Sequence, residues 1–195
     1  DEIIHKLEQL NISSSELDIP ETQRKEMLNQ VADYSNTFIN GLSKIKGYQE
    51  KEIGNLAIQN NKTSLPELLD IYQKEVAETG INAASPKHLG YIPGGGVYTA
   101  ALADYIAAVT NPFASVYYAS PGAATIENEV VNWLKSVFSF PETSVGCLSS
   151  GGSISNLIAF TAARDKHNIK NESITTSVVY LSEQVHHSAQ KALRI

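Results

Sequence analysis

A turn of small residues directly before an amphipathic helix is the feature that most restricts the fold of this chain. The turn is Ser149-Ser150-Gly151-Gly152-Ser153, and the helical pattern behind it runs to about His167. Its apolar side carries Ile154, Leu157, Ile158 and Ala162. The β-branched and aromatic run 177–181 then predicts a buried strand, and 188–194 predicts the start of another helix. Because helices that alternate with buried strands imply a parallel sheet, the sequence from Val145 onward predicts an α/β domain.

The residues before this region predict helices. A short helix ends before Pro20, and a second runs from Glu21 towards Gly47. The second helix has one apolar stripe, formed by Met27, Val31, Tyr34, Phe38 and Leu42. A capping box at Ser64-Leu65-Pro66-Glu67 predicts a third helix that continues to about Gly80.

The stretch from Ile81 to Gly96 is rich in glycine and proline and predicts a loop. After it, the Ala-rich segment 100–109 predicts a helix, and Ser120-Pro121 opens another that Pro141 closes.

Charge and composition exclude several classes of protein. The net charge of −6, without a basic stripe, argues against nucleic-acid binding. No apolar run approaches the roughly 20 residues of a membrane span, and the first ten residues lack the pattern of a signal peptide, so we expect a cytoplasmic protein. Cys147 is the sole cysteine and the histidines lack metal-site spacing, so we expect no bound metal.

The turn at 149–153 is a candidate phosphate site. Glycines allow backbone N–H groups to face a ligand, and the helix dipole favours an anion at a helix N-terminus. A tight turn without a ligand is the alternative for such a sequence taken alone. The turn is neither a Walker loop nor a GxGxxG motif.

A second candidate follows the predicted strand, at Ser182-Glu183-Gln184-Val185-His186-His187-Ser188. Ligands of open α/β sheets bind beyond the carboxyl ends of the strands, which is where these histidines are expected. Two surface histidines in a loop are the alternative.

Taken in order, these motifs resemble those of the group II pyridoxal-5′-phosphate-dependent decarboxylases, which include glutamate, aromatic-amino-acid and diaminobutyrate decarboxylases. The resemblance covers about residues 85–195. It rests on Ala119-Ser120-Pro121, Glu127, Trp133-Leu134, Ser150-Gly151-Gly152-Ser153, Asn156-Leu157, Ala163-Arg164, Ser182-Glu183-Gln184, His186-His187-Ser188 and Lys191-Ala192. It implies the N-terminal part of a fold type I PLP-dependent transferase, with an aspartate aminotransferase-like large domain, preceded by a helical segment.

The resemblance also implies roles for particular residues. Gly152 and Ser153 would hold the cofactor phosphate, while Ser150 and Gly151 would shape the turn. His186 would stack on the cofactor ring and act in catalysis; His187 is the other reading of the motif. Tyr91, Ile92, Pro93 and Gly94 would border the substrate, with a purely structural loop as the alternative.

The implied activity is that of a lyase in carboxylic acid and amino-acid metabolism, which decarboxylates an L-amino acid to the amine and CO₂. The Schiff-base lysine and the acid that pairs with the pyridinium nitrogen are not matched within these residues, and Lys191 matches an ordinary basic position. We therefore expect the 195 residues alone to be inactive. The alternatives are a truncated, non-catalytic dimerisation or regulatory module, and a PLP aminotransferase or lyase on the same fold.

The expected organisation is a helical segment at 1–84 and, at 85–195, the substrate loop with the first part of the PLP-binding domain. The resemblance implies a homodimer in which the N-terminal helices pack across the interface. Plain core packing within one chain is the other reading of the apolar stripe at 27–42.

Overall fold

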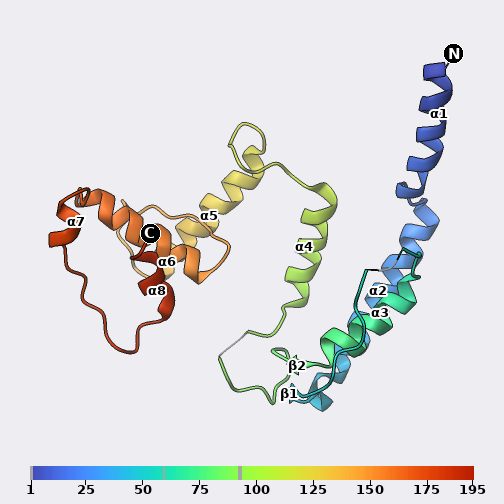
Figure 1. Cartoon of the computed structure of the whole chain (residues 1–195), viewed down its shortest axis with the longest axis horizontal. Helices are drawn as coiled ribbons and strands as arrows, with labels where there is room; N and C mark the ends of the chain where they lie inside the picture. Colours follow the sequence, from blue (N-terminus) through green and yellow to red (C-terminus); the bar gives the residue numbers. More distant parts are fainter. Residues whose placement is uncertain (1, 59, 92–93) are drawn as a thin grey trace. The chain divides into compact units, whose positions relative to one another are not determined.

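The computed structural model describes residues 2–58, 60–91 and 94–195. The chain divides into two compact units, Asp1–Ile106 and Ala107–Ile195, which are coloured from blue to green and from green to red in Figure 1.

The first unit is mainly helical. Its longer helices are α1 (Glu2–Ser14), α2 (Glu21–Gly41) and α3 (Leu65–Tyr72). Short 3₁₀ turns follow α1 and α2 at Ser15–Leu17 and Leu42–Lys44, and α3 continues as a π-helical turn, Gln73–Ala77. Two short strands, β1 (Tyr48–Gln49) and β2 (Gly80–Ile81), complete it. The three helices predicted for this region are thus confirmed, and the third ends at Ala77 rather than Gly80.

Helix α2 packs against α3, as Figure 1 shows. The rings of Tyr34 and Tyr72 meet edge to face with centroids 6.0 Å apart, and Tyr34 Oη donates a hydrogen bond of 2.7 Å to Gln73 Oε1. The start of α3 is set by Ser64, whose hydroxyl accepts from the N–H of Glu67 at 3.4 Å, as the capping box predicts. Part of the apolar stripe of α2 is therefore used for packing within the chain.

The glycine- and proline-rich loop is tied to the segment that follows α2 by hydrogen bonds. Strands β1 and β2 pair antiparallel, with Tyr48 opposite Ile81. Beyond them, the N–H of Asn82 donates to the carbonyl of Gly47 at 3.1 Å, and Ser85 Oγ donates to the carbonyl of Ile45 at 2.8 Å. Ser85 is only 3% exposed, so this anchor is shielded from water.

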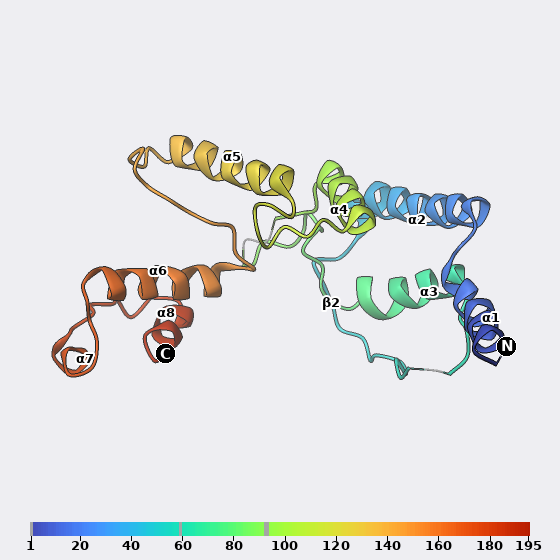
Figure 2. The same ribbon diagram turned by 90° about the horizontal axis from the view of Figure 1, so that it is seen from above.

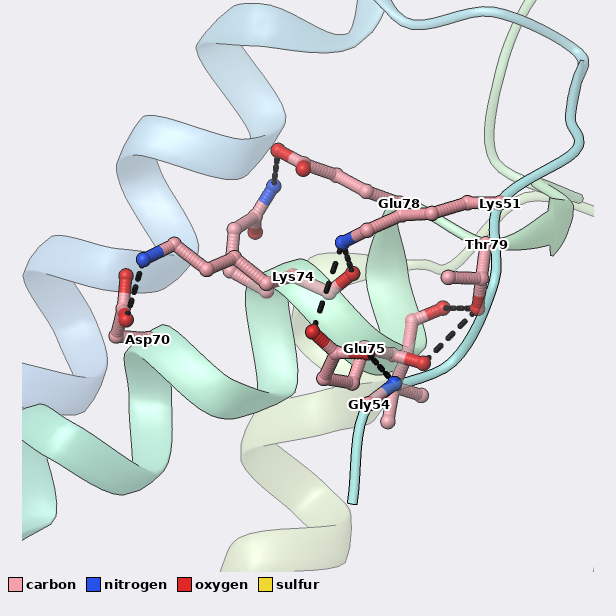
Figure 3. A network of polar contacts seen from close by, with 9 residues as sticks. Lys51, Gly54, Asp70, Lys74, Glu75, Glu78 and Thr79 are labelled. Carbon is pink, nitrogen blue, oxygen red and sulfur yellow. Dashed lines mark hydrogen bonds and ion pairs between the residues drawn. The ribbon is translucent and has the colours of Figure 1, made fainter. Parts of the chain in front are cut away.

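A polar network fixes the segment after β1 onto the π-helical turn (Figure 3). Glu75 accepts a hydrogen bond of 2.7 Å from the N–H of Gly54 and forms an ion pair of 3.6 Å with Lys51, whose ammonium group also donates to the carbonyl of Lys74. Lys74 in turn pairs with Asp70 at 2.7 Å. These contacts hold a segment that has no helix or strand of its own.

The second unit contains α5 (Pro121–Val137), α6 (Gly152–Lys166), α7 (Ser173–Thr176) and α8 (His187–Ala192). Helix α4 (Tyr98–Thr110) crosses the boundary between the units. Helix α8 lies beside α6 in both Figure 1 and Figure 2, and its buried residues are Ser188, Ala189 and Ala192. The predictions of α4, α5 and α6 are confirmed, and α5 begins at the proline that the sequence places in its first turn.

The prediction of a strand at 177–181 is wrong, because these residues form no strand. They are also exposed, and the exposed fraction of Tyr180 is 92%. A β-branched run becomes a strand only when another strand accepts its hydrogen bonds, and no partner lies beside it in the described residues. The sheet observed in the described part of the chain is antiparallel and two-stranded, so the expected parallel sheet is not formed by these residues.

Apolar side chains are mostly exposed in the described residues. Trp133 in α5, for example, is 63% exposed, and Ala189 and Ala192 are the buried apolar residues there. The apolar composition predicts a core, but helices bury their apolar faces only against another layer. In residues 2–58, 60–91 and 94–195, no helix has the length and apolar character needed to cross a membrane.

Candidate functional site

The small-residue turn ends where α6 begins, and its backbone conformation requires glycine. Gly151 precedes the helix with φ 146° and ψ 170°, a region that residues with a Cβ rarely adopt. Its carbonyl accepts from the N–H groups of Ile154 and Ser155 at 3.1 and 3.0 Å, which closes the first turn of the helix. The hydroxyl groups of Ser149 and Ser155 lie 2.6 Å apart and brace the turn.

This geometry leaves the first amide groups of α6 available to a ligand. Gly152 and Ser153 are exposed, and a Cβ added at Gly151 or Gly152 would meet no atom within 4 Å. The N–H groups at a helix N-terminus have no partner within the helix, and the helix dipole makes that end attractive to anions. The turn can therefore receive an anionic group such as a phosphate.

Glu127 of α5 holds the segment that leads into the turn. Its carboxylate accepts a hydrogen bond of 2.9 Å from the N–H of Leu148, two residues before Ser150. A carboxylate acceptor makes this bond stronger than a neutral one. Glu127 thus connects α5 to the residue directly before the turn.

His186 lies at the start of α8 and caps it. Its Nδ1 accepts from the backbone N–H of Ser188 at 3.2 Å and lies 2.8 Å from the Ser188 hydroxyl. The ring of His187 lies alongside, with centroids 4.1 Å apart and an angle of 35° between the planes. His186 itself is exposed, and because the ring of His187 lies against one side of its ring, a ligand would have to approach from the opposite side.

The structure brings the turn and His186 together through one side-chain contact between α6 and α8. Asn156 Nδ2 donates a hydrogen bond of 2.8 Å to the Ser188 hydroxyl, which is 3% exposed. Asn156 follows Gly152 by four residues, so it lies on the same face of α6, about 6 Å further along the axis. The two candidates are therefore near neighbours in the second unit.

The predicted substrate residues are only partly described. Tyr91 has φ 59°, unusual for a residue with a Cβ, and its side chain is 88% exposed. Its ring lies 6.3 Å from that of His88. A Cβ at Gly94 would meet no atom within 4 Å, and Ile92 and Pro93 lie outside the described residues. Tyr91 and Gly94 belong to the first unit, whereas the turn and His186 belong to the second.

Three residues of the site had no role assigned from the sequence: Glu127, Asn156 and Ser188. Each makes a contact with a residue distant in the chain, which no local pattern reveals. Their presence in the ordered motifs is the one signal that could have marked them.

A cavity of about 480 Å³ in the second unit is separate from these residues. It is lined by Arg164, His167 and Leu193 among others, so it lies at the C-terminal end of α6, opposite the turn. Within the described part of the chain, no group of three or more His, Cys, Asp or Glu side chains is placed to hold a metal ion.

Comparisons with known proteins identify the family. The sequence profile described as "Pyridoxal-dependent decarboxylase conserved domain" matches residues 48–195. An aromatic-L-amino-acid decarboxylase of Bacillus atrophaeus is 36% identical over 139 residues, which cover 71% of this chain and 28% of that protein. Tyrosine/DOPA decarboxylase 5 of Papaver somniferum is 28% identical, and the matched region covers 97% of this chain and 39% of that protein.

Solved structures show the same fold. A 4-hydroxyphenylacetaldehyde synthase of Rhodiola rosea superposes with a TM-score of 0.79 at 19% identity, covering 91% of this chain and 41% of that one. A tryptophan decarboxylase of Catharanthus roseus, solved with L-tryptophan, gives 0.73 at 19% identity, covering 90% and 40%. The chain spans less than half the length of each of these four relatives.

Proposed function

This chain belongs to the pyridoxal-dependent decarboxylase family, and from that premise we propose that it supplies part of the active site of an enzyme that decarboxylates an L-amino acid. Family membership confirms the resemblance found in the sequence, and the cofactor expected from it is the one that names the family. The packing of α8 on α6, which brings His186 close to the glycine turn, is the observation that carries the proposal.

We assign the cofactor phosphate to the turn. The residues fit this group, because the exposed amides of Gly152 and Ser153 and the open space beside both glycines accommodate a compact anion. The hydroxyls of Ser150 and Ser153 are the side-chain donors nearest to these amides in sequence. The backbone conformation of Gly151 sets the direction of the amide groups of Gly152 and Ser153.

Pyridoxal 5′-phosphate, when bound, accepts the electrons released as the carboxylate leaves. The chain provides orientation. His186, fixed at the start of α8, offers a flat, exposed ring that can stack on a heteroaromatic ligand whose phosphate lies at the turn. The ring nitrogen that is not bonded to Ser188 would be the group that holds or moves a proton in the reaction.

We also propose that the loop that carries Tyr91, Ile92, Pro93 and Gly94 binds the substrate. The strained backbone of Tyr91 supports this assignment, because such conformations concentrate at ligand sites. The names of the relatives favour an aromatic substrate. An aromatic side chain suits a loop that offers an exposed tyrosine ring.

The finer structural assignments are also proposals. We infer that 85–195 begins an aspartate aminotransferase-like large domain and that the helices of 1–84 pack across a homodimer interface in the cytoplasm. The exposed side of α2, which includes Val31 at 40% exposure, supports the dimer assignment. Sedimentation velocity of the full-length gene product tests it, and a monomer at micromolar concentration would contradict it.

The function is tested by CO₂ release. The full-length gene product, supplied with pyridoxal 5′-phosphate, is given L-tyrosine, L-tryptophan, L-DOPA, L-glutamate or L-2,4-diaminobutyrate, each labelled at the carboxyl group. We expect release from at least one aromatic substrate. His186→Ala should lower kcat about 100-fold or more, whereas the matched variant His187→Ala should lower it less than about 5-fold. No release from any substrate overturns the decarboxylase proposal, and equal effects overturn the choice of histidine.

A further inference from the structure

Three side chains from two helices form a directed chain of hydrogen bonds that ends on His186. Asn156 Nδ2 in α6 lies 2.8 Å from Ser188 Oγ in α8, and Ser188 Oγ lies 2.8 Å from His186 Nδ1. The serine is 3% exposed, and Asn156 is half-buried, so the junction is protected from competing water. Figures 1 and 2 show the two helices side by side.

The direction of this chain follows from the backbone. The N–H of Ser188 points to His186 Nδ1 at 3.2 Å, and a backbone N–H can only donate. Nδ1 is therefore the acceptor, and in the neutral ring the proton resides on Nε2.

The side chains agree with that direction. If the Asn156 amide were reversed, its oxygen would take the Ser188 hydroxyl hydrogen, and the serine could then only accept from Nδ1–H. The hydrogen on Nδ1 would then point towards the backbone N–H of Ser188, so that two donors would face each other without an acceptor. With Nδ2 towards the serine, every donor meets an acceptor: Asn156 donates to Ser188, and Ser188 donates to His186.

We propose that Asn156 and Ser188 are positioning residues that hold His186 with its proton on Nε2, the ring nitrogen that is not bonded to Ser188. The contact with the cofactor rests on the proposed function, whereas the hydrogen-bond chain rests on geometry alone. Because Asn156 lies one turn beyond Gly152, the helix that receives the phosphate also sets the ring that would face the cofactor. The side-chain amide of Asn156 thereby fixes the position of His186 relative to the turn at 149–153.

The first test reads the tautomer directly. The cofactor-free full-length protein, labelled with ¹³C and ¹⁵N in histidine, is studied by magic-angle-spinning NMR, and the His186 signals are those lost in His186→Gln. We expect the Nε2–H tautomer in the wild type. Asn156→Asp replaces the donor by an acceptor, so the serine hydroxyl turns to the carboxylate and Nδ1 keeps only the backbone N–H of Ser188 as a donor. The His186 Nδ1 signal should therefore shift measurably.

The control is Asn132→Asp, which introduces the same charge on an exposed position of α5 and should leave the His186 signals unchanged. A wild-type ring protonated on Nδ1 overturns the proposal. So does an Asn156→Asp spectrum in which the His186 Nδ1 signal is the same as in the wild type.

A second pair of variants covers the case in which Asn156→Asp does not fold. Ser188→Ala removes the hydroxyl and Ser188→Thr retains it. We expect Ser188→Ala to lower kcat about 10-fold with little change in KM, and Ser188→Thr to restore it to within about 2-fold. Equal losses in both variants would indicate packing alone and overturn the positioning role.

These two readouts separate the proposals. An Nε2–H signal that responds to Asn156→Asp, in a protein without decarboxylase activity, supports the hydrogen-bond chain and overturns the function. Decarboxylase activity together with a His186 signal that does not respond to Asn156→Asp supports the function and overturns the hydrogen-bond chain.

Discussion

The carboxylate of Glu127 accepts a hydrogen bond from the backbone N–H of Leu148, at 2.9 Å, and this contact joins α5 to the segment that leads into the glycine turn. Residues 143–148 have no regular secondary structure, so their position depends on such side-chain contacts. The position of the turn at 149–153 therefore depends on the position of residues 143–148.

Glu127→Ala should loosen this segment. A hydrogen bond to a charged acceptor contributes about 1.5–3 kcal/mol when buried, and partial exposure here reduces the expected loss to about 1 kcal/mol. We expect hydrogen–deuterium exchange at the Leu148 amide to quicken about 5-fold. Glu129→Ala, on an exposed position of the same helix, is the control. Unchanged exchange at Leu148 would show that the contact does not hold the segment.

The helices of this chain could be predicted because their signals are local. The Ser64 cap and the proline at the start of α5 mark helix ends within one turn, and the structure places both helices there. The glycine turn was likewise predicted at the start of α6 from residue types alone.

The remaining features depend on partners far along the chain. The run 177–181 has strand-forming residues but no strand to pair with in the described part of the chain, and β1 and β2 pair although neither has a strand pattern of its own. The contact between Asn156 and Ser188 is also of this kind. Residue types identified His186 as a candidate, but only the fold reveals what holds its ring.

Gly151→Ala should destabilise the turn, because φ 146° is unfavourable for a residue with a Cβ even though the space around it is open. We expect the free energy of unfolding to fall by about 1–3 kcal/mol and the affinity for pyridoxal 5′-phosphate to weaken. Gly122→Ala, in the first turn of α5, also has open space but no positive φ, so it should not destabilise the protein and should favour the helix by up to about 1 kcal/mol. Urea unfolding and cofactor titration of the full-length protein measure both. Equal stability of the two variants would mean that the turn does not require glycine.

Gly47→Ala should displace the loop that carries the proposed substrate residues. A Cβ at Gly47 would lie 2.8 Å from the carbonyl oxygen of Lys87, a backbone atom that cannot move alone. We expect faster exchange at the Asn82 and His88 amides, which are bonded to Gly47 and Ser85.

Gly41→Ala is the control for this change, because a Cβ there meets no atom within 4 Å and alanine favours a helix by about 0.5–1 kcal/mol. If the substrate loop is where we propose, Gly47→Ala should also raise KM for the amino acid, while Gly41→Ala should not. A Gly47→Ala protein with wild-type exchange at Asn82 and His88 would contradict the anchoring role.

Tyr34 should make stability depend on pH in the alkaline range. Burial raises the pKa of its phenol above the ordinary value of 10.0, and Coulomb repulsion from Tyr72 and Glu78 acts in the same direction. As pH rises past 10.0, the unfolded chain loses this proton before the folded chain does. The unfolded state is then favoured, so the contribution of Tyr34 to stability is complete below that pH and is lost as pH rises through the higher folded pKa.

Tyr34→Phe should therefore do two things. At about pH 8 it removes the hydrogen bond to Gln73, which lowers the free energy of unfolding by about 0.5–1.5 kcal/mol. Between about pH 9 and pH 11 the variant should lose less stability than the wild type, because it has no phenol to ionise. Urea unfolding followed by circular dichroism measures both effects, and Tyr118→Phe, at an 87% exposed position, is the control. Parallel pH profiles for Tyr34→Phe and the wild type would show that the Tyr34 phenol ionises equally in the folded and unfolded chain.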